Sequence, residues 1–410
     1  MIEPITIAIA VLAIGITVTV LSFYFFRNKR KEIALAIFSL FFFVLIAELF
    51  FRLFVPQLKE NMAMFKYDPV LGWTFIPNKR GSIVYLGEVG RYIETNSLGF
   101  RDNALPSDTA GMRKILVLGD SFVSNIGVSD DDVFTEVMEQ QLKNTLVLNF
   151  GVNGYGQVQE YLLEKEWLDK LNPDLVVLVI YLRNDFQDNI GTEYVYPRPI
   201  ASWSDEDSLR ILPPPAFTAK DTPHTSFWHS LEHLHIYALF ERIVRGVELR
   251  LRVGMEKHSL EHNPSAYTPP ELFLCRKQQS ENARLMDRTM EELLLRIARF
   301  ADKRKTPLVF ALAPSVFQVD DELWSSLLKE YRAKSEDYSS SLPNEKLMKF
   351  AEQNDLLMID LLPLLRAERE KENILYNHHE QHWNSDGNRF VAHALLDYLN
   401  ARSLINPIQK

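Results

Sequence analysis

Short apolar segments separated by stretches of helical periodicity constrain the fold of this chain more than any other feature. The segments hold four to seven residues each, are rich in Val, Ile and Leu, and are too short for buried helices. Strands that alternate with helices at this spacing predict βαβ units and a parallel sheet covered on both faces. The predicted strands are Ile115–Leu118, Leu146–Phe150, Leu175–Tyr181, Leu308–Leu312 and Leu356–Ile359, and the predicted helices lie near Asp131–Lys143, Gln157–Leu171, Glu281–Lys303, Glu322–Lys334, Asn344–Gln353 and Ser385–Ala401.

Polar residues suited to acyl-transfer chemistry follow the first three predicted strands. Ser121, Gly154 and Asn184 each come just after one strand, and His382 lies in the loop before the last helix. Because ligands bind at the carboxyl ends of parallel strands, we expect these residues to gather at one edge. A serine becomes a nucleophile when a base takes its proton and amide donors hold the resulting oxyanion. One Ser, one Gly amide, one Asn amide and one His supply those parts.

These blocks, in this order, resemble the SGNH or GDSL hydrolases. The matching residues are Gly119-Asp120-Ser121, Gly154, Arg183-Asn184-Asp185 (with Leu182 in place of the usual Gly) and His382. The resemblance covers roughly residues 114–190 and 355–400. The segments YDPVLGW (67–73) and NSLGFRD (96–102) also resemble membrane-attached bacterial members of this family.

The resemblance implies a three-layer α/β/α, flavodoxin-like fold and a cofactor-free serine esterase. It implies Ser121 as nucleophile, His382 as base, and Gly154 and Asn184 as oxyanion donors. In this family an acid lies two or three residues before the base, where this chain has Glu380 and His379 rather than Asp. We expect the Glu380 carboxylate to orient the His382 ring. One alternative is that His382 and Ser121 work as a dyad, with a backbone carbonyl orienting the ring. The other is that Asp386 supplies the acid.

Three other chemistries fit the motifs less well. GVNGYG at 151–156 has the pattern G-x-x-G-x-G rather than the dinucleotide-binding G-x-G-x-x-G. No G-x-S-x-G elbow is present, so the main signature of an α/β-hydrolase is missing. The run HHEQH at 378–382 could bind a metal only if a helix aimed both rings together, yet residues 373–384 have the character of a loop. No metal site is predicted.

The first 55 residues predict a membrane anchor. Ile5–Phe26 is uncharged and long enough to cross a bilayer, and Ile33–Val55 is a second apolar run interrupted by Glu48 and Arg52. The latter two residues, four apart, can pair on one helix face. Four basic residues in 27–31 mark the loop between the runs as cytoplasmic. A two-pass hairpin then places residues 56–410 on the periplasmic or extracellular side, with lipid contacts through residues 5–55. The alternative for Ile33–Val55 is a buried or re-entrant helix.

Composition restricts the partners. The net charge is −9, which argues against nucleic acid. Cys275 is the only cysteine, so an intramolecular disulfide and thiolate zinc sites are excluded. Protein partners are not predicted.

The predicted organisation is an anchor (1–55), a connector with short strands at Ser82–Leu86 and Tyr92–Thr95 (56–113), and a hydrolase domain (114–405) with an insertion at about 191–280. The insertion includes a helical stretch around His229–Val253. The predicted function is cleavage of an ester, with an acylated envelope glycan as one possible substrate. The alternatives are an O-acyltransferase acting on an envelope polysaccharide and a catalytically inactive glycan-binding or assembly protein.

Overall fold

The computed structural model describes residues 29–54, 64–83, 91–191, 197–215, 270–377 and 381–405, together with 234, 236, 237 and 239. The chain divides into two compact units. One unit consists of Met1–Lys59 and Thr218–Glu261, and the other of Glu60–Phe217 and His262–Lys410. The predicted apolar run Ile5–Phe26 lies outside the described residues, as does most of the predicted helix around His229–Val253.

In the smaller unit, helix α2 (Arg30–Phe54) corresponds to the second predicted apolar run. Within the described part of the chain, its segment Leu35–Phe54 is the one helix long and apolar enough to cross a membrane, with a mean hydropathy of 2.3. Glu48 and Arg52 form the expected ion pair, at 3.2 Å. The Ile236 N–H also donates to Glu48 Oε2, at 3.1 Å. Helix α2 therefore has the length and composition of a membrane span.

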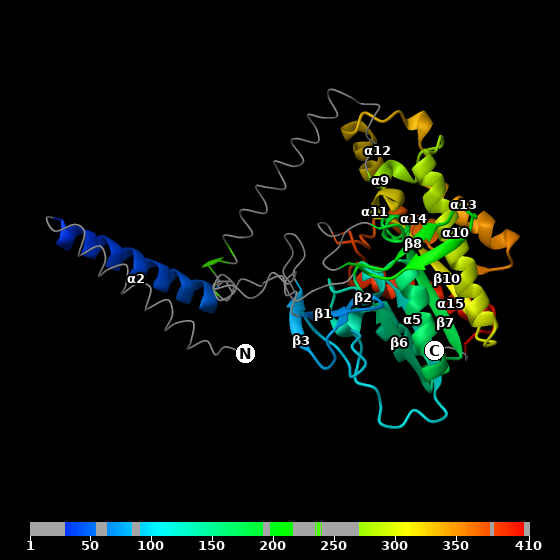
Figure 1. Cartoon of the computed structure of the whole chain (residues 1–410), viewed down its shortest axis with the longest axis horizontal. Coiled ribbons are helices and arrows are strands. Elements are labelled where there is room, and N and C mark those ends of the chain that lie inside the picture. The colour runs from blue at the N-terminus through cyan, green and yellow to red at the C-terminus, as the bar shows by residue number, and fades with distance from the viewer. Residues whose placement is uncertain are drawn as a thin grey trace. The chain divides into compact units, whose positions relative to one another are not determined.

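The larger unit is built on a five-stranded parallel sheet (Figure 1). Its strand order is β11-β10-β7-β5-β6, which corresponds to 2-1-3-4-5 in chain order when read from β6. This doubly wound order reverses direction between the first and third strands, and ligands of such folds bind there. The strands are β5 (Arg113–Gly119), β6 (Thr145–Gly151), β7 (Leu175–Tyr181), β10 (Leu308–Ala313) and β11 (Leu357–Asp360).

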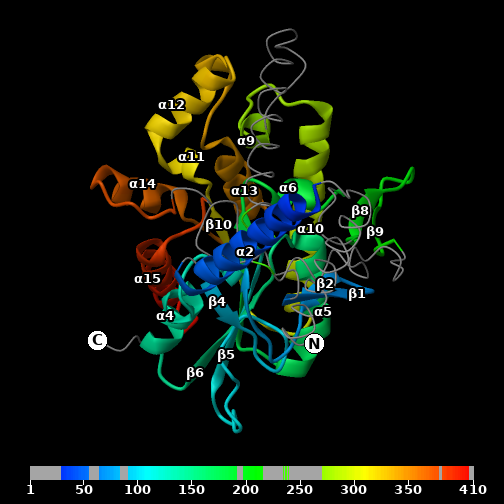
Figure 2. The same cartoon turned by 90° about the vertical axis from the view of Figure 1, so that its left-hand side faces the viewer.

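Alternate residues of each strand enter separate cores on the two faces of the sheet, which gives three layers. In β5, Leu116 and Leu118 belong to one core, whereas Ile115 and Val117 belong to the other. Helices α5 (Gln157–Leu171), α10 (Glu281–Asp302) and α13 (Leu342–Gln353) cover the first face. Helices α4 (Phe134–Gln141), α14 (Leu362–Glu370) and α15 (Ser385–Ala401) cover the second, as Figure 2 shows for α4, α5, α10 and α15.

Shorter elements complete the described part of the larger unit. Four residues of the segment between α2 and β5 are buried in the first core: Trp73, Phe75, Ile93 and Phe100. This segment therefore packs as part of the fold. The antiparallel hairpins are β1 (Phe65–Asp68) with β2 (Gly72–Phe75), β3 (Arg80–Ile83) with β4 (Arg91–Glu94), and β8 (Ile200–Trp203) with β9 (Leu209–Leu212). The short helices are α3 (Ser121–Ser124), α6 (Asp185–Asp188), α9 (Pro270–Phe273), α11 (Val316–Val319) and α12 (Asp321–Glu330), with 3₁₀ turns at Asp130–Asp132 and Ser335–Asp337.

Candidate active site

Ser121 lies at the first position of α3, directly after β5. Gly119 makes this tight turn possible, because a Cβ at that residue would lie 2.4 Å from Val123 Cγ2. Asp120 caps the short helix by accepting from the Phe122 N–H at 2.8 Å. Gly151, at the end of the neighbouring strand β6, lets the helix approach closely, since a Cβ there would lie 2.3 Å from the Ser124 nitrogen. The Ser121 side chain is half-buried at the switch point of the sheet.

His382 contacts Ser121 although 261 positions separate them. The distance between His382 Nε2 and Ser121 Oγ is 2.8 Å. The His382 ring also packs on Phe122, with centroids 4.9 Å apart. Its neighbour Trp383 is fully buried, and the Trp383 carbonyl accepts from Asn125 Nδ2 and from Asn388 Nδ2, both at 3.1 Å. The loop that carries the histidine is therefore bonded both to the end of α3, which follows the predicted nucleophile, and to α15.

Ser121 Oγ has a second acceptor, which the sequence did not predict. Asp120 Oδ2 lies 3.1 Å from the hydroxyl oxygen, and the Asp120 side chain is fully buried. Burial raises the pKa of this carboxyl to about 6, against the lowering effect of hydrogen bonds from Phe122 and Ser121. Because the hydroxyl has one proton, donation to Asp120 competes with donation to His382. The Asp120 contact thus affects how readily Ser121 loses its proton to the base.

Asn184 follows β7, the strand on the other side of β5. It precedes α6, but its side chain makes no capping bond to that helix. Instead, Asn184 Nδ2 donates to Asp188 Oδ2 at 2.6 Å, and Asp188 Oδ1 forms a buried ion pair with Arg198 at 2.8 Å. The Arg198 guanidinium lies over the Trp73 ring, 5.2 Å from its centroid. One N–H of the Asn184 amide is thereby fixed, which sets the direction of the other.

Gly154 lies in the turn after β6 and has a φ of +76°, which favours glycine. No acceptor for its N–H lies among the described residues. The turn is held from both sides, since the Asn153 carbonyl accepts from Trp73 Nε1 at 3.1 Å and the Tyr155 hydroxyl donates to the Trp73 carbonyl. The β1–β2 hairpin thus supports both loops that carry the predicted oxyanion donors.

The remaining predicted residues have different outcomes. Glu380 lies outside the described residues, as do His378 and His379. Asp386, the alternative acid, is mostly exposed and pairs with Arg389 at 2.9 Å. Asp185 is buried and accepts from the Tyr181 N–H and from Gln157 Nε2, so it stabilises its loop. Burial raises its pKa well above the usual range. Within the described ranges, no group of His, Cys, Asp and Glu is arranged to hold a metal.

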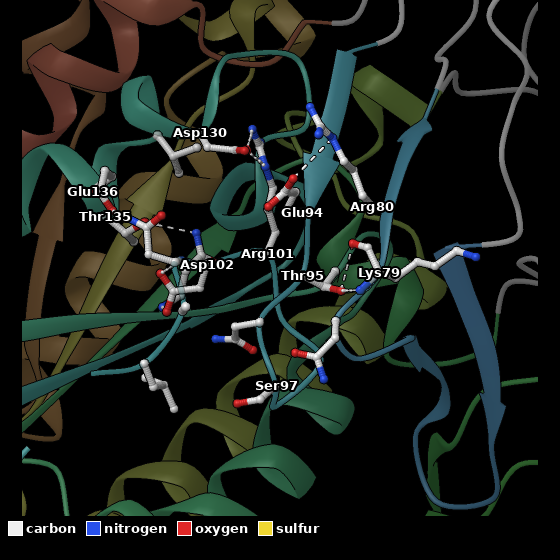
Figure 3. A pocket seen from close by; sticks show the side chains of 17 residues that line it. Lys79, Arg80, Glu94, Thr95, Ser97, Arg101, Asp102, Asp130, Thr135 and Glu136 are labelled. Atoms are coloured by element: carbon white, nitrogen blue, oxygen red, sulfur yellow. Dashed lines mark hydrogen bonds and ion pairs between the residues drawn. The ribbon is translucent and has the colours of Figure 1, made fainter. Parts of the chain in front are cut away.

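Two cavities of the larger unit have linings that include neither Ser121 nor His382. An apolar cavity of about 220 Å³ is lined by Tyr376, Asn377 and Gln381 from the His382 loop, together with Phe317 and Leu365. A polar cavity of about 610 Å³ (Figure 3) contains neither Ser121 nor His382. Asp102 lines it, and burial raises the pKa of this carboxyl to about 8. The smaller cavity is the one that shares a loop with the predicted base.

Comparison with known proteins gives structural matches only. No protein-family model matches the sequence, and no curated protein matches it. Among solved structures, the chain is similar to a member of the lipolytic protein G-D-S-L family from Veillonella parvula, with 12% identity, coverage of 70% of this chain and 97% of that chain, and a TM-score of 0.35. It is similar to an acetyl xylan esterase, with 14% identity, coverage of 69% and 98%, and a TM-score of 0.36. It is also similar to a lipase/acylhydrolase from Enterococcus faecalis, with 12% identity, coverage of 73% and 100%, and a TM-score of 0.35.

One of these structures is described as a member of the G-D-S-L family, which is the family that the sequence motifs resemble. At such low identity and TM-score, the proposal of function rests on the side chains of this chain.

Proposed function

We propose that this protein is a membrane-anchored serine esterase of the SGNH or GDSL type, which cleaves an O-acyl ester through an acyl-enzyme on Ser121. The observation that carries the proposal is the 2.8 Å contact between His382 Nε2 and Ser121 Oγ. A nucleophile and base within hydrogen-bond reach are the first geometric requirement for this chemistry. The catalytically inactive alternative gives no reason for a half-buried serine and a histidine to meet at the switch point.

The reaction follows from the roles of the side chains. His382 Nε2 takes the Ser121 hydroxyl proton as Oγ bonds to the ester carbon, and the carbonyl oxygen becomes an oxyanion. The Gly154 N–H and the free N–H of Asn184 stabilise that charge. The imidazolium then gives its proton to the leaving oxygen as the C–O bond breaks, leaving an acyl-enzyme. Water, deprotonated by His382, releases the acid in a second, equivalent step. Glu380 is proposed to orient the imidazole through Nδ1.

The experiment that tests this function measures ester turnover by the purified full-length protein in detergent. We expect hydrolysis of O-acyl esters, because Ser121 Oγ lies 2.8 Å from the nitrogen of the proposed base. Each ester is assayed with and without a soluble oligosaccharide acceptor. Turnover that is independent of the acceptor supports the esterase. Turnover that requires the acceptor, with an acylated sugar as product, assigns an O-acyltransferase instead, and no turnover with any ester overturns the proposal.

We further propose that residues 5–55 form a two-pass anchor in the cytoplasmic membrane, with the larger unit on the periplasmic or extracellular side. The length and apolar character of α2 support one of the two spans. The cluster of basic residues at 27–31 supports a cytoplasmic loop. A reporter fused after Lys410 should be active only as an exported protein, and a reporter inserted at 27–31 only as a cytoplasmic one. A cytoplasmic carboxyl terminus would contradict the topology.

A further inference from the structure

Arg101 is buried against the loop that follows the nucleophile. Its side chain is only 2% exposed, although it comes from the segment before the first sheet strand. One guanidinium nitrogen, Nη1, donates to the Ser124 carbonyl at 2.8 Å and to the Asn125 carbonyl. The other, Nη2, donates to the Val128 carbonyl at 2.7 Å. A single side chain thus satisfies three backbone carbonyls at and beyond the end of α3.

The charge of Arg101 is balanced at the surface end of the same loop. Asp130 Oδ1 accepts from Arg101 Nε at 2.9 Å and from Nη2 at 2.6 Å (Figure 3). Asp130 is itself 46% exposed, so the pair joins the buried loop to its solvent-facing turn. The planar fork of Arg makes these bonds together, whereas a Lys ammonium could not.

The backbone that presents Arg101 is itself held rigidly. Asn96 Oδ1 accepts from the Leu98 and Phe100 N–H groups, at 3.0 and 3.2 Å. Gly99 has a φ of +84°, and a Cβ there would lie 3.0 Å from the Phe75 carbonyl oxygen. Phe100 stacks on Phe150 with centroids 3.8 Å apart. Arg101 therefore acts from a fixed point on the first core.

Asn125 links the Arg101 contacts to both members of the Ser121–His382 pair. Its N–H donates to the Ser121 carbonyl at 2.9 Å, which closes the single turn of α3. Its side-chain Nδ2 donates to the carbonyl of Trp383, the residue after His382, at 3.1 Å. Asn125 has a φ of +27°, a conformation that an external bond to its carbonyl helps to hold.

We propose that Arg101 is a positioning residue, which acts through Asn125 to set the distance between Ser121 Oγ and His382 Nε2. This inference rests on the proposed function, and it adds that the proposed reaction requires Arg101 to hold the Ser121–His382 distance. Arg101 does not touch the reacting atoms. Its effect arises because a displaced Asn125 would shift the nucleophile turn and the His382 loop relative to each other.

The test compares three variants with the full-length wild type. Arg101→Met removes every donor, Arg101→Lys keeps the charge, and Asn125→Gly keeps the backbone conformation while removing only the bond to Trp383. The control is Arg366→Met. Arg366 is half-buried and, like Arg101, donates to more than one group: the Gln318 carbonyl and the Ser340 hydroxyl, both at 2.8 Å. Neither of these groups belongs to the Ser121 turn or the His382 loop. The readouts are the rate of fluorophosphonate labelling, kcat, KM and the thermal midpoint.

We expect Arg101→Met and Asn125→Gly to lower the labelling rate and kcat by about 10- to 100-fold with KM nearly unchanged, because small misplacements of reacting groups cost up to about 10²-fold. Arg101→Lys should recover part of the loss. Arg366→Met should lower the thermal midpoint without changing the labelling rate.

Asn125→Gly leaves the buried guanidinium in place, so it tests the link even if Arg101→Met fails to fold. A wild-type labelling rate and a wild-type kcat in Asn125→Gly would overturn the inference. Equal losses in Arg101→Met and Arg366→Met would also overturn it, by showing a general effect of destabilisation. If the wild type itself is not labelled, the proposed function fails first, and the inference with it.

Discussion

Replacing Ser121 with alanine is expected to abolish both covalent labelling and ester turnover. The substitution removes the oxygen that lies 2.8 Å from His382 Nε2. Loss of the nucleophile in a serine hydrolase costs on the order of 10⁶ in kcat, so only the small residual rate that the oxyanion donors and substrate binding support should remain. Steady-state turnover and labelling by a fluorophosphonate measure this directly, with Ser208→Ala as the control because the Ser208 hydroxyl is exposed and bonds only to that of Ser204 among the described residues.

His382→Ala should be nearly as severe, and the double variant should be no worse than either single one, because the two side chains act as a unit. Glu380→Gln tests the proposed acid in the same assay, and normal turnover in that variant would favour the dyad. Undiminished esterase activity in Ser121→Ala would place the site elsewhere in the chain.

Asn184→Ala is expected to lower kcat by about 10²–10³, the usual cost of removing one oxyanion donor. The amide is well placed for this role, because its bond of 2.6 Å to Asp188 leaves one N–H free and fixes its direction. KM should change little, since the donor acts on charge that develops only in the transition state. The measurement is the separate determination of kcat and KM for one ester.

Asn103→Ala is the matched control for Asn184, because Asn103 also donates to a carboxylate (Glu136, at 2.6 Å) but on the exposed surface. It should leave kcat unchanged. If Asn184→Ala loses less than about threefold in kcat while its thermal midpoint falls, Asn184 has only a structural role beside Asp188.

Some elements could be predicted closely from local patterns. β7 (Leu175–Tyr181), α5 (Gln157–Leu171) and α15 (Ser385–Ala401) have the predicted bounds. The other four sheet strands differ from prediction by one or two residues at an end, since strand ends depend on pairing with neighbours. The predicted helix near Asp131–Lys143 is in fact a 3₁₀ turn followed by α4, which begins at Phe134.

Other elements are too short to show a clear hydrophobic periodicity, so the sequence did not predict them. α14 (Leu362–Glu370) and the hairpins β1–β2 and β8–β9 are short, with four to nine residues per element. In the connector, β3 begins two residues before the predicted strand Ser82–Leu86. β4 begins one residue before the predicted strand Tyr92–Thr95. Elements of this length are stabilised mainly by the surface they pack on, which no local pattern records.

The sequence by itself determined the strand–helix alternation, the long apolar helix near the amino terminus and the positions of Ser121, Gly154 and Asn184 at strand ends, because these depend on local periodicity and turn chemistry. Local patterns did not show which of the carboxyl-terminal histidines is the base, and only the family resemblance indicated His382. Only the tertiary structure joined His382 to Ser121 and placed the Asp120 carboxylate on the same hydroxyl. It also connected Arg101, through Asn125, to the Ser121 turn and to the His382 loop. The physical reason is that such contacts join segments up to 261 positions apart. They depend on strand order and on the packing of loops, which leave no periodic signal along the chain.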